Sequence, residues 1–217
     1  MSTILADLSE RRVSHLRRIV MIRHGETVGN SRERLHGAAD IALSDEGRVQ
    51  MRAAARALHQ EVFDVVVASP LRRSWQSAAV IAPCAPVRLV PEFREIDFGR
   101  WEGMSLDEVK AADPVLYADW RARKPGFEYP GGELRAAFRE RVGVGLARIE
   151  EIGAQGALLV VHKGVIRTIA EMLRGEPLEG NEPELGGRIA LSLNADGRWF
   201  LGRDSSNPQP LEEDPPR

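Results

Sequence analysis

Two histidines and two arginines follow three short apolar runs, and these residue types are suited to holding and transferring a phosphoryl group. The runs and the residues after them are 19–22 with Arg23 and His24, 65–68 with Arg73 four positions after Ser69, and 158–161 with His162. Runs this short and this apolar are typical of buried strands in a parallel or mixed sheet. Ligands bind such sheets beyond the carboxyl ends of the strands, so we expect the four side chains to meet in one crevice.

His24 is the candidate nucleophile because it stands beside an arginine and before a glycine, directly after a strand. Near neutral pH a useful fraction of imidazole is uncharged and can attack phosphorus. Arg23 and Arg73 are suited to bidentate hydrogen bonds with the phosphoryl oxygens. His162 and the Asn30 amide can donate further bonds, and a backbone carbonyl near the loop can hold the His24 ring in the correct tautomer.

Phosphoryl transfer to histidine also requires an acid that protonates the leaving alkoxide. Glu95 is the best candidate, because it lies in a loop between the short strand expected at 87–90 and the irregular stretch after it. Partial burial beside a bound phosphate would keep this carboxyl protonated. On chemistry alone, Glu26 and Glu102 remain rivals for the role.

The composition indicates an ordinary globular chain of one domain. Its 217 residues carry a formal net charge of −2, which gives no sign of nucleic-acid binding. Cys84, the single cysteine, excludes an intramolecular disulfide and a cysteine-based metal site. No apolar run is long enough for a membrane span, and the N-terminal stretch lacks the apolar core of a secretory signal. We therefore expect a cytoplasmic protein, and the sequence is compatible with a homodimer.

Alternating strand and helix patterns position these residues and predict an α/β fold. We expect helices at 44–60, 70–82, 133–152 and 164–173, two short helices at 105–111 and 114–121, and a hairpin at 188–201. Ser44 is the expected N-cap of the first helix, and Pro70 is expected at the first position of the second. The domain organisation that we expect is an N-terminal extension at 1–16, a catalytic domain at 17–204 with a cap segment at about 100–131, and a disordered tail at 205–217.

Four motifs in this order resemble those of the histidine phosphatase superfamily, in the branch of cofactor-dependent phosphoglycerate mutases and small-molecule phosphatases. They are RHGET at 23–27, SPLRRSWQSA at 69–78, REIDFGRWEG at 94–103 and VHKGVIR at 161–167. The resemblance runs from about Arg18 to Leu193. It implies a three-layer α/β sandwich with a central mixed, mainly parallel sheet and a small cap insertion.

The resemblance also implies roles for individual residues. His24 would form the phosphohistidine, Arg23, Arg73 and His162 would complete the phosphate pocket, and Glu95, in preference to Glu26 and Glu102, would donate the proton. Thr27, Asn30 and Lys163 are expected substrate contacts. Lys163 replaces a glycine that is usual after the second histidine and would favour a substrate with a second anionic group. No metal and no cofactor are implied.

The leading hypothesis is a metal-independent phosphomonoesterase that hydrolyses a small phosphorylated metabolite. The region 95–103 looks closest to phosphatases of small metabolites, including α-ribazole-5′-phosphate phosphatases. A phosphoglycerate mutase is the alternative with the same fold, although mutases usually carry a longer insert after the glutamate. An inactive phosphate-binding module and a metal-dependent phosphatase are weaker alternatives, the latter because paired histidine ligand spacings are missing.

Overall fold

A six-stranded mixed sheet forms the centre of the molecule. The computed structural model describes residues 15–180 and 183–202. Its strands are β1 (Arg18–Arg23), β2 (Val65–Ala68), β3 (Val87–Leu89), β4 (Gly156–Val161), β5 (Arg188–Leu193) and β6 (Trp199–Leu201), in the order β3-β2-β4-β1-β5-β6. β1, β2, β3 and β4 are parallel, whereas β5 and β6 continue the sheet as an antiparallel hairpin. The mixed, mainly parallel sheet predicted from the sequence is confirmed.

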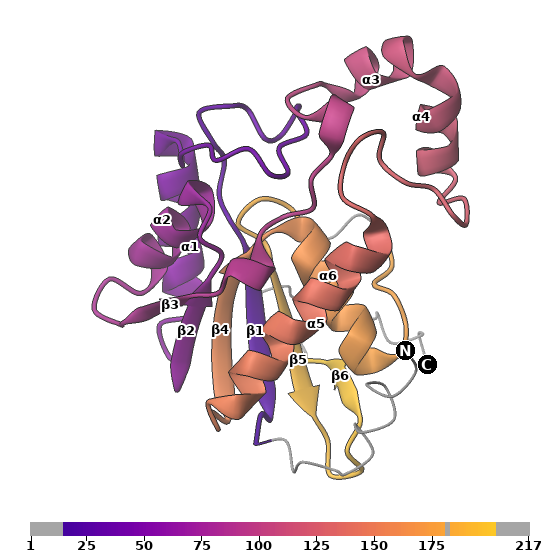
Figure 1. Ribbon diagram of the computed structural model, residues 1–217. Coiled ribbons are helices and arrows are strands. Elements are labelled where there is room, and N and C mark those ends of the chain that lie inside the picture. Colours follow the sequence, from indigo (N-terminus) through magenta and orange to yellow (C-terminus); the bar gives the residue numbers. More distant parts are fainter. Residues whose placement is uncertain (1–14, 181–182, 203–217) are drawn as a thin grey trace, which may run out of the picture.

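Helices cover both faces of this sheet (Figure 1). α1 (Asp45–Ala57) and α2 (Arg72–Ile81) pack on one face, and α5 (Arg135–Glu151) and α6 (Lys163–Arg174) pack on the other. α3 (Leu106–Ala112) and α4 (Pro114–Arg121) lie apart from the sheet. Successive strand residues point to opposite faces, so each face has its own core. Val20 and Val160 pack with Met51 of α1 on one face, while Met21 and Leu159 belong to the core on the other.

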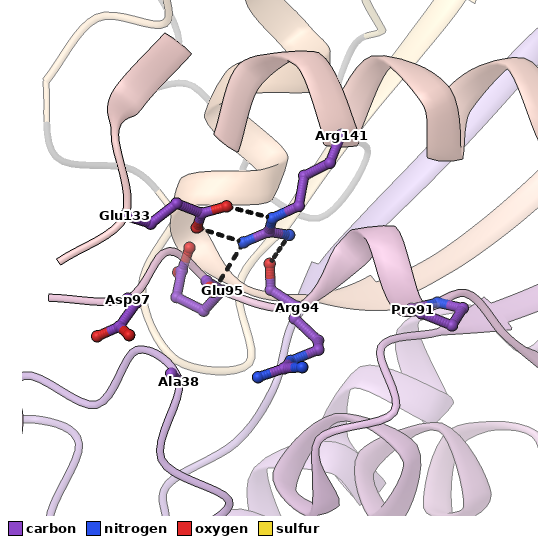
Figure 2. A pocket seen from close by; sticks show the side chains of 7 residues that line it. All are labelled: Ala38, Pro91, Arg94, Glu95, Asp97, Glu133 and Arg141. Atoms are coloured by element: carbon purple, nitrogen blue, oxygen red, sulfur yellow. Dashed lines mark hydrogen bonds and ion pairs between the residues drawn. The ribbon is translucent and has the colours of Figure 1, made fainter. Parts of the chain in front are cut away.

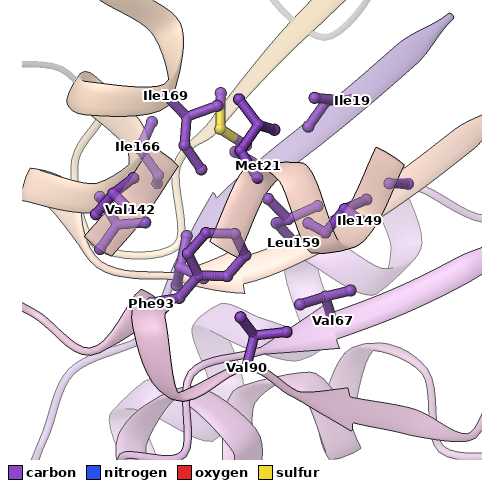
Figure 3. Packing of buried hydrophobic residues seen from close by; sticks show 14 of the residues in the cluster. Ile19, Met21, Val67, Val90, Phe93, Val142, Ile149, Leu159, Ile166 and Ile169 are labelled. Atoms are coloured by element: carbon purple, nitrogen blue, oxygen red, sulfur yellow. The ribbon is translucent and has the colours of Figure 1, made fainter. Parts of the chain in front are cut away.

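The larger core joins α5 and α6 to the sheet. Figure 3 shows Val142 and Ile149 of α5 and Ile166 of α6 gathered around Met21 and Leu159. All five side chains are fully buried. This packing fixes where the two helices begin relative to the strand ends. The apolar stripe of the long helix is therefore core packing, as the sequence indicates.

Two helices begin two residues later than the sequence predicts. α2 begins at Arg72 because the Leu71 amide donates to the Ser69 hydroxyl, a local turn that competes with helix in the stretch around Pro70. α5 begins at Arg135, because the Glu133 amide donates instead to the Asp97 carbonyl. Ser44 caps α1 as predicted, its side chain accepting from the Gly47 amide.

Residues 99–132 form a segment with a small core of its own. Trp101, Val109 and Phe127 are buried there, and Figure 1 shows α3 and α4 standing at the top, beyond the upper ends of β1 and β4. Leu16, which the sequence analysis assigns to an extension, is fully buried in the larger core. The remaining expectations for the extension and the tail fall at 1–14 and 203–217, outside the described residues. Among the described residues, no helix has the length and apolar character that crossing a membrane requires.

Candidate active site

His24 stands directly after β1 and is held in one tautomer. Its Nδ1 lies 2.8 Å from the Gly25 carbonyl oxygen, which can only accept, so Nδ1 carries the proton. The other ring nitrogen, Nε2, then bears the lone pair and accepts a hydrogen bond from Arg73 Nε at 3.2 Å. The backbone carbonyl expected from the sequence is therefore that of Gly25, and Nε2 is the ring nitrogen that bears the lone pair.

Arg73 is fully buried and is fixed by main-chain carbonyls. It lies in the first turn of α2 and donates to the carbonyls of His36, Gly37 and Ala39, at 3.1, 2.8 and 2.6 Å. These bonds occupy the terminal nitrogens and leave the Nε edge facing His24. Burial lowers the pKa of Arg73 to about 10, so the guanidinium still carries its charge at neutral pH.

His162 and Arg23 bring unpaired polar atoms to the same place. The His162 ring packs edge-on against His24, with ring centroids 5.1 Å apart. Among the described residues, neither His162 nitrogen has a hydrogen-bond partner, and the buried Nε of Arg23 has none either. Buried polar atoms without a partner are costly, so their presence beside His24 fits a site that binds a phosphate through them. The structure thus brings together the four residues predicted to meet.

Both histidines are kept neutral by their surroundings. Burial lowers the pKa of His24 and of His162 well below the ordinary value, and the charges of Arg73 and Arg23 lower both further. A neutral imidazole is the form that attacks phosphorus. The surroundings of His24 therefore favour this neutral form.

This neutrality makes the fold sensitive to acid. Because the unfolded chain binds protons near pH 6.5 that folded His24 and His162 do not bind, the free energy of unfolding falls as the pH drops below that value, by up to about 1.4 kcal/mol per pH unit for each histidine. We expect His162→Gln to weaken this dependence between pH 7.5 and 5.5. Urea unfolding midpoints measure it, and parallel losses in the variant and the wild type would contradict this account.

Glu95 lies within the electrostatic reach of this cluster and is 8% exposed. One carboxyl oxygen accepts from the Ile96 amide and the other from the Gly164 amide in the first turn of α6, both at 3.0 Å. Burial raises the pKa of Glu95, while those two amides and the charges of Arg73 and Arg23 act in the opposite direction. A carboxyl whose pKa is raised near a bound phosphate suits proton donation.

Gly164 leaves room for the Glu95 carboxyl. A Cβ added to this glycine would lie 2.3 Å from Glu95 Oε1. We expect Gly164→Ala to displace the carboxyl and reduce kcat roughly 10- to 100-fold, since small errors in the position of a catalytic group are costly. Steady-state kinetics beside Gly143→Ala test this, because a Cβ at Gly143 meets its nearest atom at an ordinary 3.5 Å. Equal activity in the two variants would argue against this placement of Glu95.

The carboxylates of Glu26 and Glu102 accept hydrogen bonds from backbone amides. Glu26 accepts from the amides of Thr27, Ser31 and Arg32. Glu102 accepts from the amides of Gly37, Ala38 and Phe98. Both oxygens of each carboxylate are therefore held by backbone amides. Each one instead shapes a loop.

The three expected substrate contacts have other contacts here. The Thr27 hydroxyl lies 2.8 Å from that of Ser31, and the exposed Asn30 amide donates to Glu33 at 2.8 Å. Lys163 is half-buried at the first position of α6. Their roles toward a substrate stay predictions.

Sequence reasoning missed Ser77, which links the nucleophile loop to α2. Its hydroxyl accepts from the Gly25 amide at 3.2 Å and donates to the Arg73 carbonyl. Its place four residues after Arg73, on the same helix face, was the available signal.

Comparison with known proteins decides the family. The model of the histidine phosphatase superfamily (branch 1) matches residues 19–198. The chain belongs to this family. It is a histidine phosphatase, and the resemblance of its four motifs is confirmed.

Relatives of this histidine phosphatase carry several substrate names. It is 36% identical to a glucosyl-3-phosphoglycerate phosphatase of Mycolicibacterium vanbaalenii, over 86% of this chain and 93% of that one. It is 34% identical to phosphoserine phosphatase 1 of Hydrogenobacter thermophilus, over 58% of this chain and 60% of that one. The crystal structure of the α-ribazole phosphatase from Shigella flexneri superposes with a TM-score of 0.73 at 29% identity, covering 85% of this chain and 94% of that one.

Proposed function

We propose that this histidine phosphatase is a metal-independent phosphomonoesterase that works through a phosphohistidine on His24. The lone pair of His24 Nε2 attacks phosphorus, and the bond from phosphorus to the ester oxygen breaks. Glu95 gives its proton to the leaving alkoxide, so the alcohol departs neutral. Water then attacks the phosphohistidine and loses a proton to Glu95, which releases inorganic phosphate and restores both groups.

One observation carries this proposal: His24 Nε2 lies 3.2 Å from Arg73 Nε while Nδ1 is engaged with the Gly25 carbonyl. The atom with the lone pair therefore lies next to a fixed positive charge. Arg73, with Arg23 and His162 beside it, is suited to neutralising the oxygens of a phosphoryl group in transfer. The raised pKa of Glu95 supports its role as the acid.

The substrate that we propose is a small phosphorylated metabolite. Relatives named for a phosphorylated sugar acid, a phosphorylated amino acid and a phosphorylated nucleoside-like compound support this class. The three named substrates differ widely, but each is a phosphate monoester of a small molecule.

Phosphate release from a panel of monoesters in excess EDTA tests the proposal. The panel holds nitrophenyl phosphate, phosphoserine, 3-phosphoglycerate, glucosyl-3-phosphoglycerate, sugar phosphates and α-ribazole phosphate. We expect release that EDTA leaves unchanged and that is fastest for one alkyl ester. Loss of release in EDTA, with recovery on adding a divalent metal, would overturn metal independence. Transfer between phosphoglycerates without net release would instead favour a mutase.

A further inference from the structure

A cavity of about 290 Å³ lies beside the segment that carries Glu95. It is lined by Ala38, Pro91, Arg94, Glu95, Asp97, Glu133 and Arg141. Figure 2 shows Arg141 reaching from α5 toward the main chain at Arg94 and Glu95, with Ala38 and Asp97 at the other side of the view. The lining includes Glu95 but neither catalytic histidine, so the cavity borders the acid and not the nucleophile.

All five N–H donors of Arg141 have acceptors. Nη1 donates to the carbonyls of Glu92 and Arg94, at 2.7 and 2.6 Å, and Nη2 donates to the Glu95 carbonyl at 3.0 Å. Nε and Nη2 each donate to one carboxylate oxygen of Glu133, at 2.6 and 2.7 Å. A guanidinium has five donors in a fixed plane, so this set uses its whole capacity and fixes its orientation.

The segment around Glu95 depends on these bonds. After the short 3-10 helix at Pro91–Phe93, residues 94–98 belong to no helix or strand. Backbone carbonyls that lie outside regular structure need a donor from elsewhere when they are buried. Arg141 supplies that donor for the buried Glu95, and it also binds the carbonyl of the exposed Arg94.

Glu133, which binds the Arg141 guanidinium, also contacts the segment around Glu95. The Glu133 amide donates to the Asp97 carbonyl at 3.0 Å, and its carboxylate holds the guanidinium. The Arg141 guanidinium also lies over the ring of Phe138, 4.8 Å from its centroid, and Phe138 belongs to the larger core. The start of α5 therefore connects the main chain of Glu95 to the packed interior.

We infer that Arg141 is a positioning residue for the proton donor: its five hydrogen bonds hold the Glu95 main chain so that the carboxyl reaches the leaving oxygen. The inference rests on the proposed function, in which Glu95 is the acid. Arg141 acts through the backbone and touches no reacting atom. Its loss therefore affects the reaction only as far as the reaction needs the acid.

The test compares Arg141→Met with the wild type on two substrates, nitrophenyl phosphate and the best alkyl ester of the panel. The alkyl leaving group needs a proton, whereas nitrophenolate scarcely does. We expect kcat/KM to fall about 10- to 100-fold for the alkyl ester and by less than about threefold for nitrophenyl phosphate. Arg141→Lys should lose less, because an ammonium retains three donors in place of five.

A double variant separates positioning from general damage. If Arg141 acts only through Glu95, adding Arg141→Met to Glu95→Gln costs nothing further on the alkyl ester. The matched control is Arg139→Met on the same helix, which removes an exposed ion pair with Glu171 and should leave both rates unchanged.

Equal losses of Arg141→Met on both esters, or losses that add in the double variant, would overturn the inference. Were Arg141→Met to unfold, Arg141→Lys carries the same comparison. A Glu95→Gln enzyme that shows no preference between the esters would instead overturn the acid role of Glu95, and so the two failures are distinguishable.

Discussion

Turnover of every phosphate ester is expected to vanish in His24→Ala, with a fall in kcat of at least about 10⁴-fold. The variant lacks the lone pair that Nε2 presents beside Arg73 Nε. His162 is the neighbouring imidazole, and its ring lies edge-on to that of His24 at a centroid distance of 5.1 Å. The measurement is phosphate release in EDTA, beside alkaline quench of the enzyme with labelled substrate, since phosphohistidine survives base.

The fold should tolerate the change. His24 is buried, and its removal leaves the Gly25 carbonyl and Arg73 Nε each without one partner, a cost of about 1–3 kcal/mol. Thermal unfolding reports this cost separately from activity. The matched control is His59→Ala, because that exposed histidine lies away from the site and its Nδ1 is 2.9 Å from the Arg56 carbonyl oxygen. Full activity in His24→Ala, or phosphoryl label retained on the variant after alkaline quench, would contradict a covalent mechanism on His24.

Replacing Glu95 by glutamine should slow hydrolysis of esters with poor leaving groups much more than that of esters with good leaving groups. Glutamine keeps the size of the side chain but cannot give up a proton, so hydrolysis of alkyl esters should fall about 10²- to 10⁴-fold. Nitrophenyl phosphate should be hydrolysed at close to the wild-type rate of phosphorylation. Stopped-flow measurement of the nitrophenolate burst isolates that step from the later attack of water, for which Glu95 is also required as base.

The matched control is Glu92→Gln in the same stretch of chain, whose carboxylate pairs with Arg148 at the surface of α5. It should leave both substrates unaffected. The same fractional loss of Glu95→Gln on both esters would assign Glu95 a role other than proton donation. A variant that binds substrate poorly would appear in KM, whereas loss of the proton appears in the rate of the first step.

Much of this arrangement could be predicted because it follows from strand ends. β1 and β4 pair in parallel from Arg18 with Gly156 to Arg23 with Val161, so the residues after them meet at the same edge. The apolar runs that indicated those strands are buried throughout. Once the strands are recognised, the placement of His24 and His162 needs no further information.

The partners of Glu95 could not be predicted in the same way. Its carboxyl bonds to Gly164, 69 positions away in sequence, and its carbonyl to Arg141, 46 positions away. Neither contact leaves a periodic pattern in the sequence, because both depend on how α5 and α6 begin above the sheet. Glu26 and Glu102 likewise have the right chemistry for an acid, and only the amides that surround them show their actual roles.

Glu102 also has a consequence for the charge of the site. Its carboxylate takes the amides of Gly37 and Ala38, while Arg73 takes the carbonyl of Gly37 on the other side of the same peptide stretch. Burial lowers the pKa of Arg73, and the charges of Glu95 and then of Glu102 oppose that effect. Glu102 is thus a counter-ion to which Arg73 makes no direct hydrogen bond. A carboxylate in direct contact would occupy the guanidinium edge and compete with a substrate phosphate. A counter-ion one peptide away stabilises the cation in the interior and leaves its Nε to donate to His24.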